Sequence, residues 1–321
     1  WSKKAFKEAK IFGDARCVAS SEDENFSYVP DVRALQLSDD ADYVYICQNE
    51  TIYGTVYHEL PNTNGKPLVA DVSSCFLSEP MDVSKYGLIY GGVQKNIGPA
   101  GVTIVIVRDD LVREEVLPFT PTIMRYTTQA KAKSLSNTPP AYGIYICGLV
   151  FKWLKEMGGL SVMAERNKEK AAILYDYLDQ SKLFRGTARK EDRSLMNVPF
   201  VTGSDELDAL FVAEAKSHGI ESIKGHRSVG GMRASIYDAM PKAAWDGVSM
   251  LYSKTLDAGN RQTQARFACV ECGFEENADV VGAINVLRAG HARLACEVSG
   301  AVMPPAAGTH RSDSGAAQCH L

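Results

Sequence analysis

Lys95 is the residue of this chain whose setting points most directly to chemistry. It lies in a glycine-rich stretch, residues 90–101, between two apolar runs that predict strands. Upstream, Asp71 ends another apolar run beside a pair of serines. An amine and a carboxylate buried around one flat ring would let the amine form an imine with an aldehyde cofactor, while the carboxylate keeps the ring nitrogen protonated. From spacing alone, a solvated lysine near an ordinary strand-ending aspartate explains the residues equally well.

The elements that would position these residues form an alternating α/β pattern. Apolar runs that predict strands lie at residues 43–47, 67–72, 86–90 and 102–107. Residues 2–12 predict a basic amphipathic helix, and residues 48–51 a polar loop. Thr51, Asp71 and Lys95 lie at or just beyond strands, and ligands gather at the carboxyl ends of strands in such layered sheets. The three side chains are therefore consistent with one pocket rim.

The second half of the chain predicts a smaller α/β unit. Helices are expected at residues 141–157, 160–178, 205–218 and 241–256, and strands at 196–202 and 231–237. Asn137 or Thr138 is expected to cap the first of these helices, ahead of two prolines. The helices near 141–178 would bridge the two units.

Composition limits the class of protein. The chain has 321 residues, 45% hydrophobic and 23% charged, with a net charge of −4. These values are typical of a globular protein of about two domains, without a general attraction to nucleic acid or to acidic membranes. No apolar run approaches the ~20 residues that span a bilayer. Cys17, Cys47, Cys75 and Cys147 lie in or beside apolar runs, so we expect buried thiols and a reducing cytoplasm.

Several long motifs, in the same order, resemble the phosphoserine aminotransferase family. They are residues 69–74, 91–101, 136–140, 151–155, 196–200 and 225–237, and the resemblance runs from Trp1 to about residue 256. It implies an α/β fold type I transferase that depends on pyridoxal phosphate. The large domain would hold a mainly parallel, incomplete sheet and the small C-terminal domain would be α/β. It also implies a cytoplasmic homodimer that shares its active sites, with small-molecule substrates and with no nucleic acid or membrane partner.

The resemblance assigns roles around the cofactor. Lys95 would hold the cofactor as an imine and then move a proton between the substrate and the cofactor. Asp71 would hold the ring nitrogen protonated, and Trp1 would stack on the ring. The remaining cofactor contacts would be Thr51 to the phenolic oxygen, Gln94 to the phosphate, and Asn137 and Thr138 to the phosphate of the neighbouring subunit. Without the resemblance, a core tryptophan, a turn hydroxyl and a helix cap explain these residues.

The substrate residues follow from the same resemblance. Arg233 would bind the substrate carboxylate, and His226 with Arg227 would form part of a phosphate site, because guanidinium groups match both anions. The expected reaction exchanges the amine of glutamate with the keto group of 3-phosphohydroxypyruvate. Another type I aminotransferase acting on a non-phosphorylated amino acid is an alternative. The His226–Arg227 pair argues against it, because it adds cations beyond the arginine that a carboxylate needs.

The sequence also departs from the family. Family members carry a long segment before the position of Trp1, with a Gly-Gly-Ala-Thr cup for the cofactor phosphate and a His-Arg pair for the substrate phosphate. Because this chain starts at Trp1, we expect it to bind the cofactor weakly and to turn over poorly. The expected organisation is 1–145 as part of the large domain, 146–256 as bridging helices and small domain, and 257–321 as a foreign, disordered tail.

That tail resembles the C-terminal end of transposon-encoded TnpB proteins. In those proteins two Cys-x-x-Cys knuckles bind zinc, whereas here Cys269 and Cys272 form only one. Other tail residues that could complete a zinc site are His291, Cys296, His310 and Cys319. Their spacing fits no known ribbon, so no metal is expected. Asp279 would match a nuclease carboxylate but lacks its partners. A zinc- or nucleic-acid-binding transposon fragment is the third functional reading.

Overall fold

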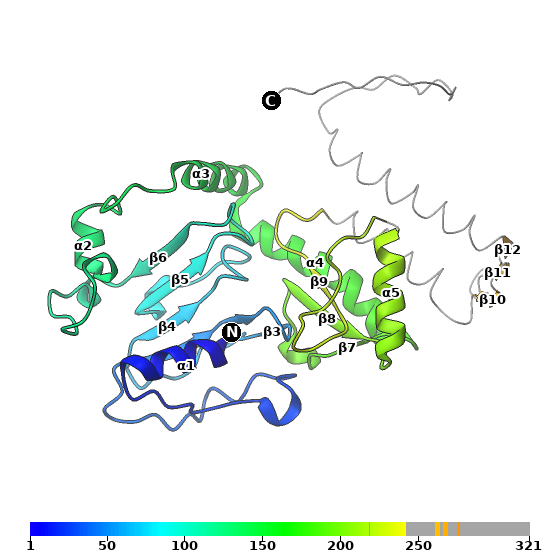
Figure 1. Cartoon of the computed structure of the whole chain (residues 1–321), viewed down its shortest axis with the longest axis horizontal. Coiled ribbons are helices and arrows are strands. Elements are labelled where there is room, and N and C mark those ends of the chain that lie inside the picture. The colour runs from blue at the N-terminus through cyan, green and yellow to red at the C-terminus, as the bar shows by residue number, and fades with distance from the viewer. Residues whose placement is uncertain (218, 242–260, 264–265, 269–274, 277–321) are drawn as a thin grey trace, which may run out of the picture.

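The computed structural model describes residues 1–217, 219–241, 261–263, 266–268 and 275–276. Two α/β units lie side by side, one holding β4, β5 and β6 and the other β7, β8 and β9 (Figure 1). Each has its own hydrophobic core. The predicted helix at 241–256, Cys269 with Cys272, Asp279 and the rest of the predicted tail lie outside the described residues, apart from short segments whose backbone is given below.

The larger unit is built on a mainly parallel sheet, as predicted. Its strands, in the spatial order β1-β4-β5-β6, are β1 (Val44–Cys47), β4 (Leu68–Asp71), β5 (Leu88–Gly92) and β6 (Thr103–Val107). The first three are parallel and β6 is antiparallel. Strand side chains alternate between the faces of a sheet, so β4 buries Leu68 and Ala70 while Asp71 at its end is only half-buried.

A short hairpin corrects the polar loop expected at residues 48–51. The strands β2 (Asn49–Glu50) and β3 (Thr55–Val56) pair antiparallel, with Asn49 opposite Val56. The turn between them includes Thr51, which is buried. The hairpin was not predicted because residues 48–51 are polar. Their side chains form hydrogen bonds to other parts of the protein, so the sequence lacks the alternation of apolar residues that indicates a strand.

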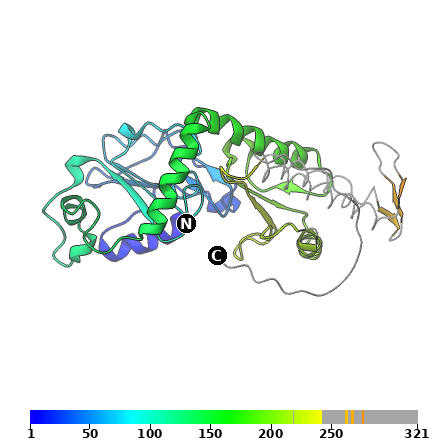
Figure 2. The ribbon, with the colours of Figure 1, turned by 90° about the horizontal axis from the view of Figure 1, so that it is seen from above.

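Four helices lie beside this sheet or follow it in the chain. They are α1 (Ser2–Phe12), α2 (Tyr126–Lys131), α3 (Ala141–Glu156) and α4 (Gly159–Gln180). Helix α4 extends along both units (Figure 2). The Asn167 side-chain amide donates to the carbonyl of Ser78 in the larger unit, 2.9 Å away, and Leu174 packs in the smaller core. Helix α4 therefore contacts both units.

The smaller unit pairs a sheet with one helix. Strands β7 (Arg185–Gly186), β8 (Asn197–Val201) and β9 (Met232–Ser235) are antiparallel, and α5 (Asp205–Ser217) packs against them. Phe184, Phe200 and Phe211 meet edge to face, with centroids 5.1 to 6.0 Å apart. A further antiparallel sheet is formed by β10 (Arg261–Thr263), β11 (Arg266–Ala268) and β12 (Glu275–Glu276).

Two local predictions are wrong. Pro140 is the residue that precedes the first turn of α3, and no side chain caps that helix; the Asn137 amide instead donates to the carbonyl of Thr138. Prolines at 139 and 140 separate the polar pair from the helix start, which removes it from capping distance. Cys17 is exposed rather than buried, whereas Cys47, Cys75 and Cys147 are buried as expected. Within the described part of the chain, no helix is long and apolar enough to cross a membrane.

Candidate active site

Lys95 presents a desolvated amine. It follows β5, and its Nζ donates to the hydroxyl of Thr51, 2.8 Å away in the β2–β3 turn. Burial lowers the pKa of Lys95 below its usual value, although the negative charge of Asp71 acts in the opposite direction. Among the residues that the structure describes, no carboxylate forms an ion pair with Lys95. A lysine with a neutral partner and a lowered pKa is suited to nucleophilic attack on a carbonyl carbon.

Asp71 comes from the neighbouring strand. It is the last residue of β4 and lies in register with Tyr90 of β5, so Asp71 and the segment leading to Lys95 leave the sheet at the same edge. Its Oδ1 accepts the backbone N–H of Ser73, 2.9 Å away. The negative charge of Asp71 raises the pKa of Lys95, against the larger lowering by burial. The predicted meeting of these residues at the carboxyl ends of parallel strands agrees with this geometry.

Arg233 enters the region from the smaller unit. It lies on β9, and its Nη1 donates to the backbone carbonyl of Thr51 across 3.2 Å. Its Nε is buried without a partner in the protein. Thr51 therefore receives Lys95 on its side chain and Arg233 on its backbone. A guanidinium with a spare buried donor beside a reactive amine can bind a carboxylate in two-pronged fashion.

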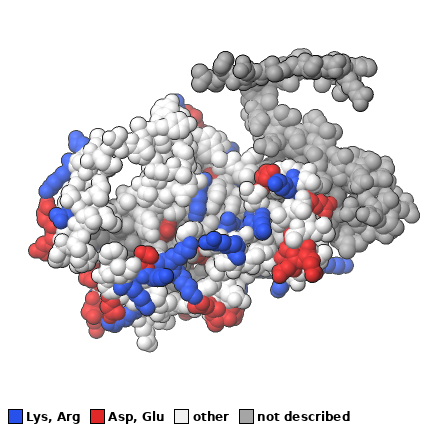
Figure 3. Space-filling model, viewed as in Figure 1, with Lys and Arg blue, Asp and Glu red and all other residues white. Residues whose placement is uncertain are grey.

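Arg227 adds positive charge in the loop before β9, next to His226. The backbone N–H of Ser228 donates to His226 Nδ1, 3.2 Å away. Burial lowers the pKa of His226, and the positive charges of Arg233, Arg227, Lys4 and the amine of Trp1 add to that effect. Figure 3 shows a band of Lys and Arg side chains across this face of the molecule. Cations that gather on a chain of net charge −4 suit an anionic ligand.

Trp1 is held at the start of α1 by an acid that sequence reasoning missed. The amine of Trp1 forms a 2.8 Å ion pair with Glu50, whose Oε2 also accepts the N–H of Ser2 across 3.3 Å. Lys4 Nζ lies 4.5 Å from the centroid of the Trp1 ring. Glu50 directly precedes Thr51, and that adjacency was the available signal. The carboxylate serves the free N–H groups at the start of the helix.

The other predicted cofactor residues are not joined to this group by any hydrogen bond that the structure records. Gln94 is exposed, and its side chain folds back over Gly92, where an added Cβ would meet Gln94 Oε1 at 2.5 Å. Asn137 and Thr138 are exposed in the segment between α2 and α3. Their predicted contacts, one of them with a neighbouring subunit, stay predictions.

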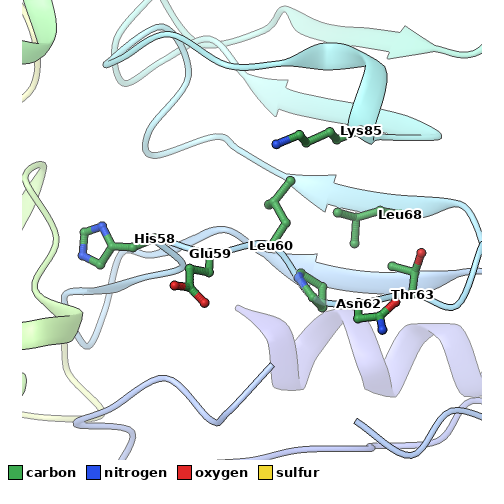
Figure 4. A pocket seen from close by; sticks show the side chains of 8 residues that line it. His58, Glu59, Leu60, Asn62, Thr63, Leu68 and Lys85 are labelled. Atoms are coloured by element: carbon green, nitrogen blue, oxygen red, sulfur yellow. The ribbon is translucent and has the colours of Figure 1, made fainter. Parts of the chain in front are cut away.

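An open polar hollow of about 580 Å³ lies elsewhere on the larger unit (Figure 4). Its walls include His58, Glu59, Asn62, Leu68 and Lys85, and none of the residues around Lys95 lines it. The charged side chains there form no ring of ligands. Within the described ranges, no group of three or more His, Cys, Asp or Glu side chains could hold a metal ion.

The residues around Lys95 fit pyridoxal phosphate. A desolvated amine without an ion pair can attach to the aldehyde, and a carboxylate at the same sheet edge can face a ring nitrogen. The unpartnered Nε of Arg233 leaves a donor for the substrate. The arrangement can therefore hold an aldehyde cofactor and an anionic amino acid together.

Comparison with known proteins gives one consistent result. The family model "Aminotransferase class-V" matches residues 1–246. The chain is 50% identical to a phosphoserine aminotransferase of Bacillus cereus over 263 residues, covering 81% of this chain and 72% of that protein. For the Haemophilus influenzae protein of the same name the identity is 49% over 256 residues, covering 79% and 69%.

Solved structures agree. The phosphoserine aminotransferase of Bacillus circulans subsp. alkalophilus superposes with a TM-score of 0.76 at 45% identity, covering 78% of this chain and 69% of that one. The enzyme of Trichomonas vaginalis, solved with pyridoxal phosphate bound, gives 0.74 at 40% identity, covering 78% and 72%.

Proposed function

Because the chain belongs to the class-V aminotransferases and, among them, to the phosphoserine aminotransferases, we propose which of its residues carry the reaction. The reaction is the pyridoxal phosphate-dependent transfer of an amino group between glutamate and 3-phosphohydroxypyruvate, a step of serine biosynthesis. The observation that carries the assignment is the Lys95 amine, desolvated and held only 2.8 Å from the Thr51 hydroxyl.

Lys95 is the proposed catalytic residue. When bound, pyridoxal phosphate supplies an aldehyde carbon for attachment and a ring that delocalises the charge left at the substrate α-carbon. The lowered pKa of Lys95 makes its neutral amine available both to attach the cofactor and, once released, to take the proton from that α-carbon. The Thr51 hydroxyl orients the amine and would bond the phenolic oxygen.

Asp71, Trp1 and Gln94 complete the proposed cofactor contacts in this chain. The Asp71 carboxylate, at the end of β4, would hold a proton on the ring nitrogen. The Trp1 ring would stack on the cofactor ring, supported by its position at the start of α1 near the cation band. Gln94 would bond the cofactor phosphate, since it follows β5 directly before Lys95.

Arg233, His226 and Arg227 would select the substrate. Arg233 would bind the α-carboxylate, because its Nη1 is anchored on Thr51 and its Nε has no partner in the protein. His226 and Arg227 would bind the substrate phosphate, and the lowering of the His226 pKa, mainly by burial and further by the charge of Arg227, supports a shared anion site. A substrate with both anions would then be placed across Lys95.

A homodimer in the cytoplasm belongs to the same proposal. Asn137 and Thr138 would bond the cofactor phosphate of the second copy. Close to them the large side chains Met124, Tyr142 and Tyr145 are exposed, which supports burial against that copy. The unpaired thiols of the described cysteines support a reducing compartment. Sedimentation should give twice the mass of the chain, and a monomer at micromolar concentration would contradict the dimer.

We also propose the boundaries and the origin of the tail. Units at 1–145 and 146–256 are supported by the presence of two cores, although Cys147 and Met196 pack in the core of the larger unit. The TnpB-like origin proposed for residues 257–321 rests on the resemblance of their sequence, and the family match that ends at residue 246 supports only a tail outside the family. Deleting residues 260–321 should leave the soluble yield unchanged or higher, and a clear loss of yield would contradict a foreign tail.

Borohydride reduction tests the function. In the presence of pyridoxal phosphate, reduction followed by peptide mapping should place a pyridoxyl group on Lys95. Amino transfer from glutamate should accompany it. A label on another lysine, or no label on Lys95 when pyridoxal phosphate is present without an amino donor, would refute the role of Lys95.

A further inference from the structure

Two fully buried asparagines join the units directly beneath the site. Asn49, the first residue of β2, and Asn197, the first residue of β8, are 1% and 0% exposed. The amide of Asn49 donates to Asn197 Oδ1 across 2.9 Å, although the residues are 148 positions apart. A buried amide is costly unless its hydrogen bonds are made, so this pair has a defined partner set.

Asn49 makes hydrogen bonds on both sides of the junction, and Asn197 makes its other bonds within the smaller unit. Asn49 also donates to Ser74 Oγ, 2.7 Å away, and its Oδ1 accepts the hydroxyl of Ser194. The Asn197 amide donates to Ser235 Oγ and to the hydroxyl of Tyr237, at 3.2 and 3.1 Å. The network therefore reaches the segment after β4, the hairpin β2–β3, and both β8 and β9.

The hairpin also packs tightly on β8. Gly54, at a φ of +72° that favours glycine, brings the turn so close that an added Cβ would lie 2.2 Å from Pro199 Cδ and 2.7 Å from the carbonyl of Asn197. The carbonyl of Gly54 accepts the N–H of Ser194 at 2.8 Å. Backbone packing and side-chain bonds thus fix the same contact.

Members of the network lie within three positions of Thr51, Asp71 and Arg233 in the sequence. Thr51 lies two positions beyond Asn49, Ser74 three positions beyond Asp71, and Arg233 two positions before Ser235, which is in register with Asn197. The hydrogen bond from Arg233 to the Thr51 carbonyl adds a further link between β9 and the β2–β3 turn. We infer that Asn49 and Asn197 are positioning residues: their paired amides hold β9, and with it the Arg233 guanidinium, in register with Thr51 and Lys95.

The consequence is a fixed spacing between the carboxylate-binding arginine and the reactive amine, and this inference rests on the proposed function. Transfer needs the substrate α-carbon beside Lys95 while its carboxylate is bound by Arg233. A displacement of about 1 Å can cost roughly a hundredfold in rate. Since Lys95 and Asp71 both belong to the larger unit, weakening the junction should affect substrate binding and leave cofactor attachment in place.

The test measures binding of glutarate, an unreactive dicarboxylate, by calorimetry in the presence of pyridoxal phosphate. Arg233→Ala should abolish binding, which identifies the site. Asn197→Ala should weaken glutarate binding by roughly tenfold to a hundredfold, while borohydride still labels Lys95. Ser78→Ala is the matched control, because that buried hydroxyl donates only to Cys75 within its own turn, 2.7 Å away; it should change neither quantity.

Other outcomes overturn the inference. Unchanged glutarate affinity in Asn197→Ala would do so, and so would a parallel loss of labelling, which would make the network a requirement of folding alone. If Asn197→Ala is insoluble, Tyr237→Phe decides, since it removes one acceptor of the Asn197 amide and keeps the ring; a glutarate affinity equal to the parent's would refute positioning. A chain that binds glutarate through Arg233 but transfers no amine would refute amino transfer by this chain and leave the comparison of glutarate affinities intact.

Discussion

Among the residues that the structure describes, Lys95 and Lys170 have amines whose pKa is lowered by burial, and we propose a cofactor site only at Lys95. Lys170, in α4, is 2% exposed, and burial lowers its pKa to about 8. Its Nζ donates to the carbonyl of Tyr237 across 2.8 Å. Lys95 is half-buried, donates to a hydroxyl, and shares Thr51 with Arg233.

The difference lies in the surroundings and in access. Lys170 has Asp238 nearby, whose charge raises the pKa of the amine, and Asp238 is itself bonded by the Asn167 amide at 2.8 Å. That group is enclosed between α4 and the residues after β9. The charge near Lys95 includes the guanidinium of Arg233, which adds to the lowering of the lysine pKa by burial. A lowered pKa alone therefore does not identify a catalytic lysine, because structural burial produces it too.

Substituting the two lysines one at a time gives the largest expected difference in the rate of amino transfer. Lys95→Ala should lower the rate of amino transfer at least a thousandfold, since both attachment of the cofactor and proton transfer are lost. Lys170→Met should leave the rate nearly unchanged, because methionine fills the same space without a charge. Steady-state rates with glutamate and 3-phosphohydroxypyruvate measure both. The comparison breaks if Lys170→Met loses activity while its unfolding midpoint is unchanged.

The next largest difference in rate is expected between variants of Asp71 and Asp238, the acids near these two lysines. Asp71→Asn should slow amino transfer by about a hundredfold or more, because an amide cannot hold the ring nitrogen in its protonated form. The absorbance of the bound cofactor should shift with it. Asp238→Asn should keep both the rate and the spectrum. Equal losses in the two variants would show that the acids act together through the fold.

Asp238 should instead control stability with pH. Burial raises its pKa to about 6 from 3.8, against the opposing effects of the Asn167 hydrogen bond and the Lys170 charge. The folded protein therefore binds a proton that the unfolded chain releases between these values, so the contribution to stability is present below about pH 4 and is lost as pH rises through 6. The contribution is about 2–3 kcal/mol in the free energy of unfolding.

Urea unfolding at pH 4.5 and pH 7 measures this contribution. Other carboxyl groups titrate over the same range, so the informative quantity is the difference between the parent and Asp238→Asn at each pH. The variant should lose less stability on going to pH 7 than the parent does. An amide can also donate to Asn167 Oδ1, which is buried and has no partner, and this favours the variant at pH 7. Identical changes in the two proteins would contradict an enclosed, protonated Asp238.

The contrast also explains what the sequence could predict. Strands ending at Asp71 and before Lys95 were predictable, because apolar runs and glycines mark them. The helix at residues 160–178 was also predictable, because its apolar residues recur with a regular period. Arg233 came only from the resemblance of its motif. Its bond to the Thr51 carbonyl spans 182 positions, and no local pattern encodes such a contact.

The missed residues are neutral or paired within the interior. Asn49 and Asn197 carry no charge. The first was expected in a polar loop and the second in a strand, and neither pattern indicates the contact that the fold makes between them. Glu50 reads as a solvated acid, yet it holds the start of α1. The cap assigned to Asn137 failed because neighbouring prolines moved the helix start. Tertiary contact, rather than propensity, decides such positions.

Thr51→Val gives the smallest and most specific change. Valine keeps the shape of threonine and the backbone carbonyl that accepts Arg233, and it removes the hydroxyl that accepts the Lys95 amine and would bond the phenolic oxygen of the cofactor. Losing one hydrogen bond at a buried site costs about 1 kcal/mol, so amino transfer should slow by roughly fivefold to tenfold. Because the carbonyl remains, the KM for glutamate should stay close to that of the parent, and the loss should lie in kcat. The pH dependence of kcat should also differ from that of the parent, because the hydroxyl that orients the Lys95 amine is absent. A rise in KM with unchanged kcat would instead show that the Thr51 hydroxyl acts on the substrate and that Lys95 is oriented by other groups.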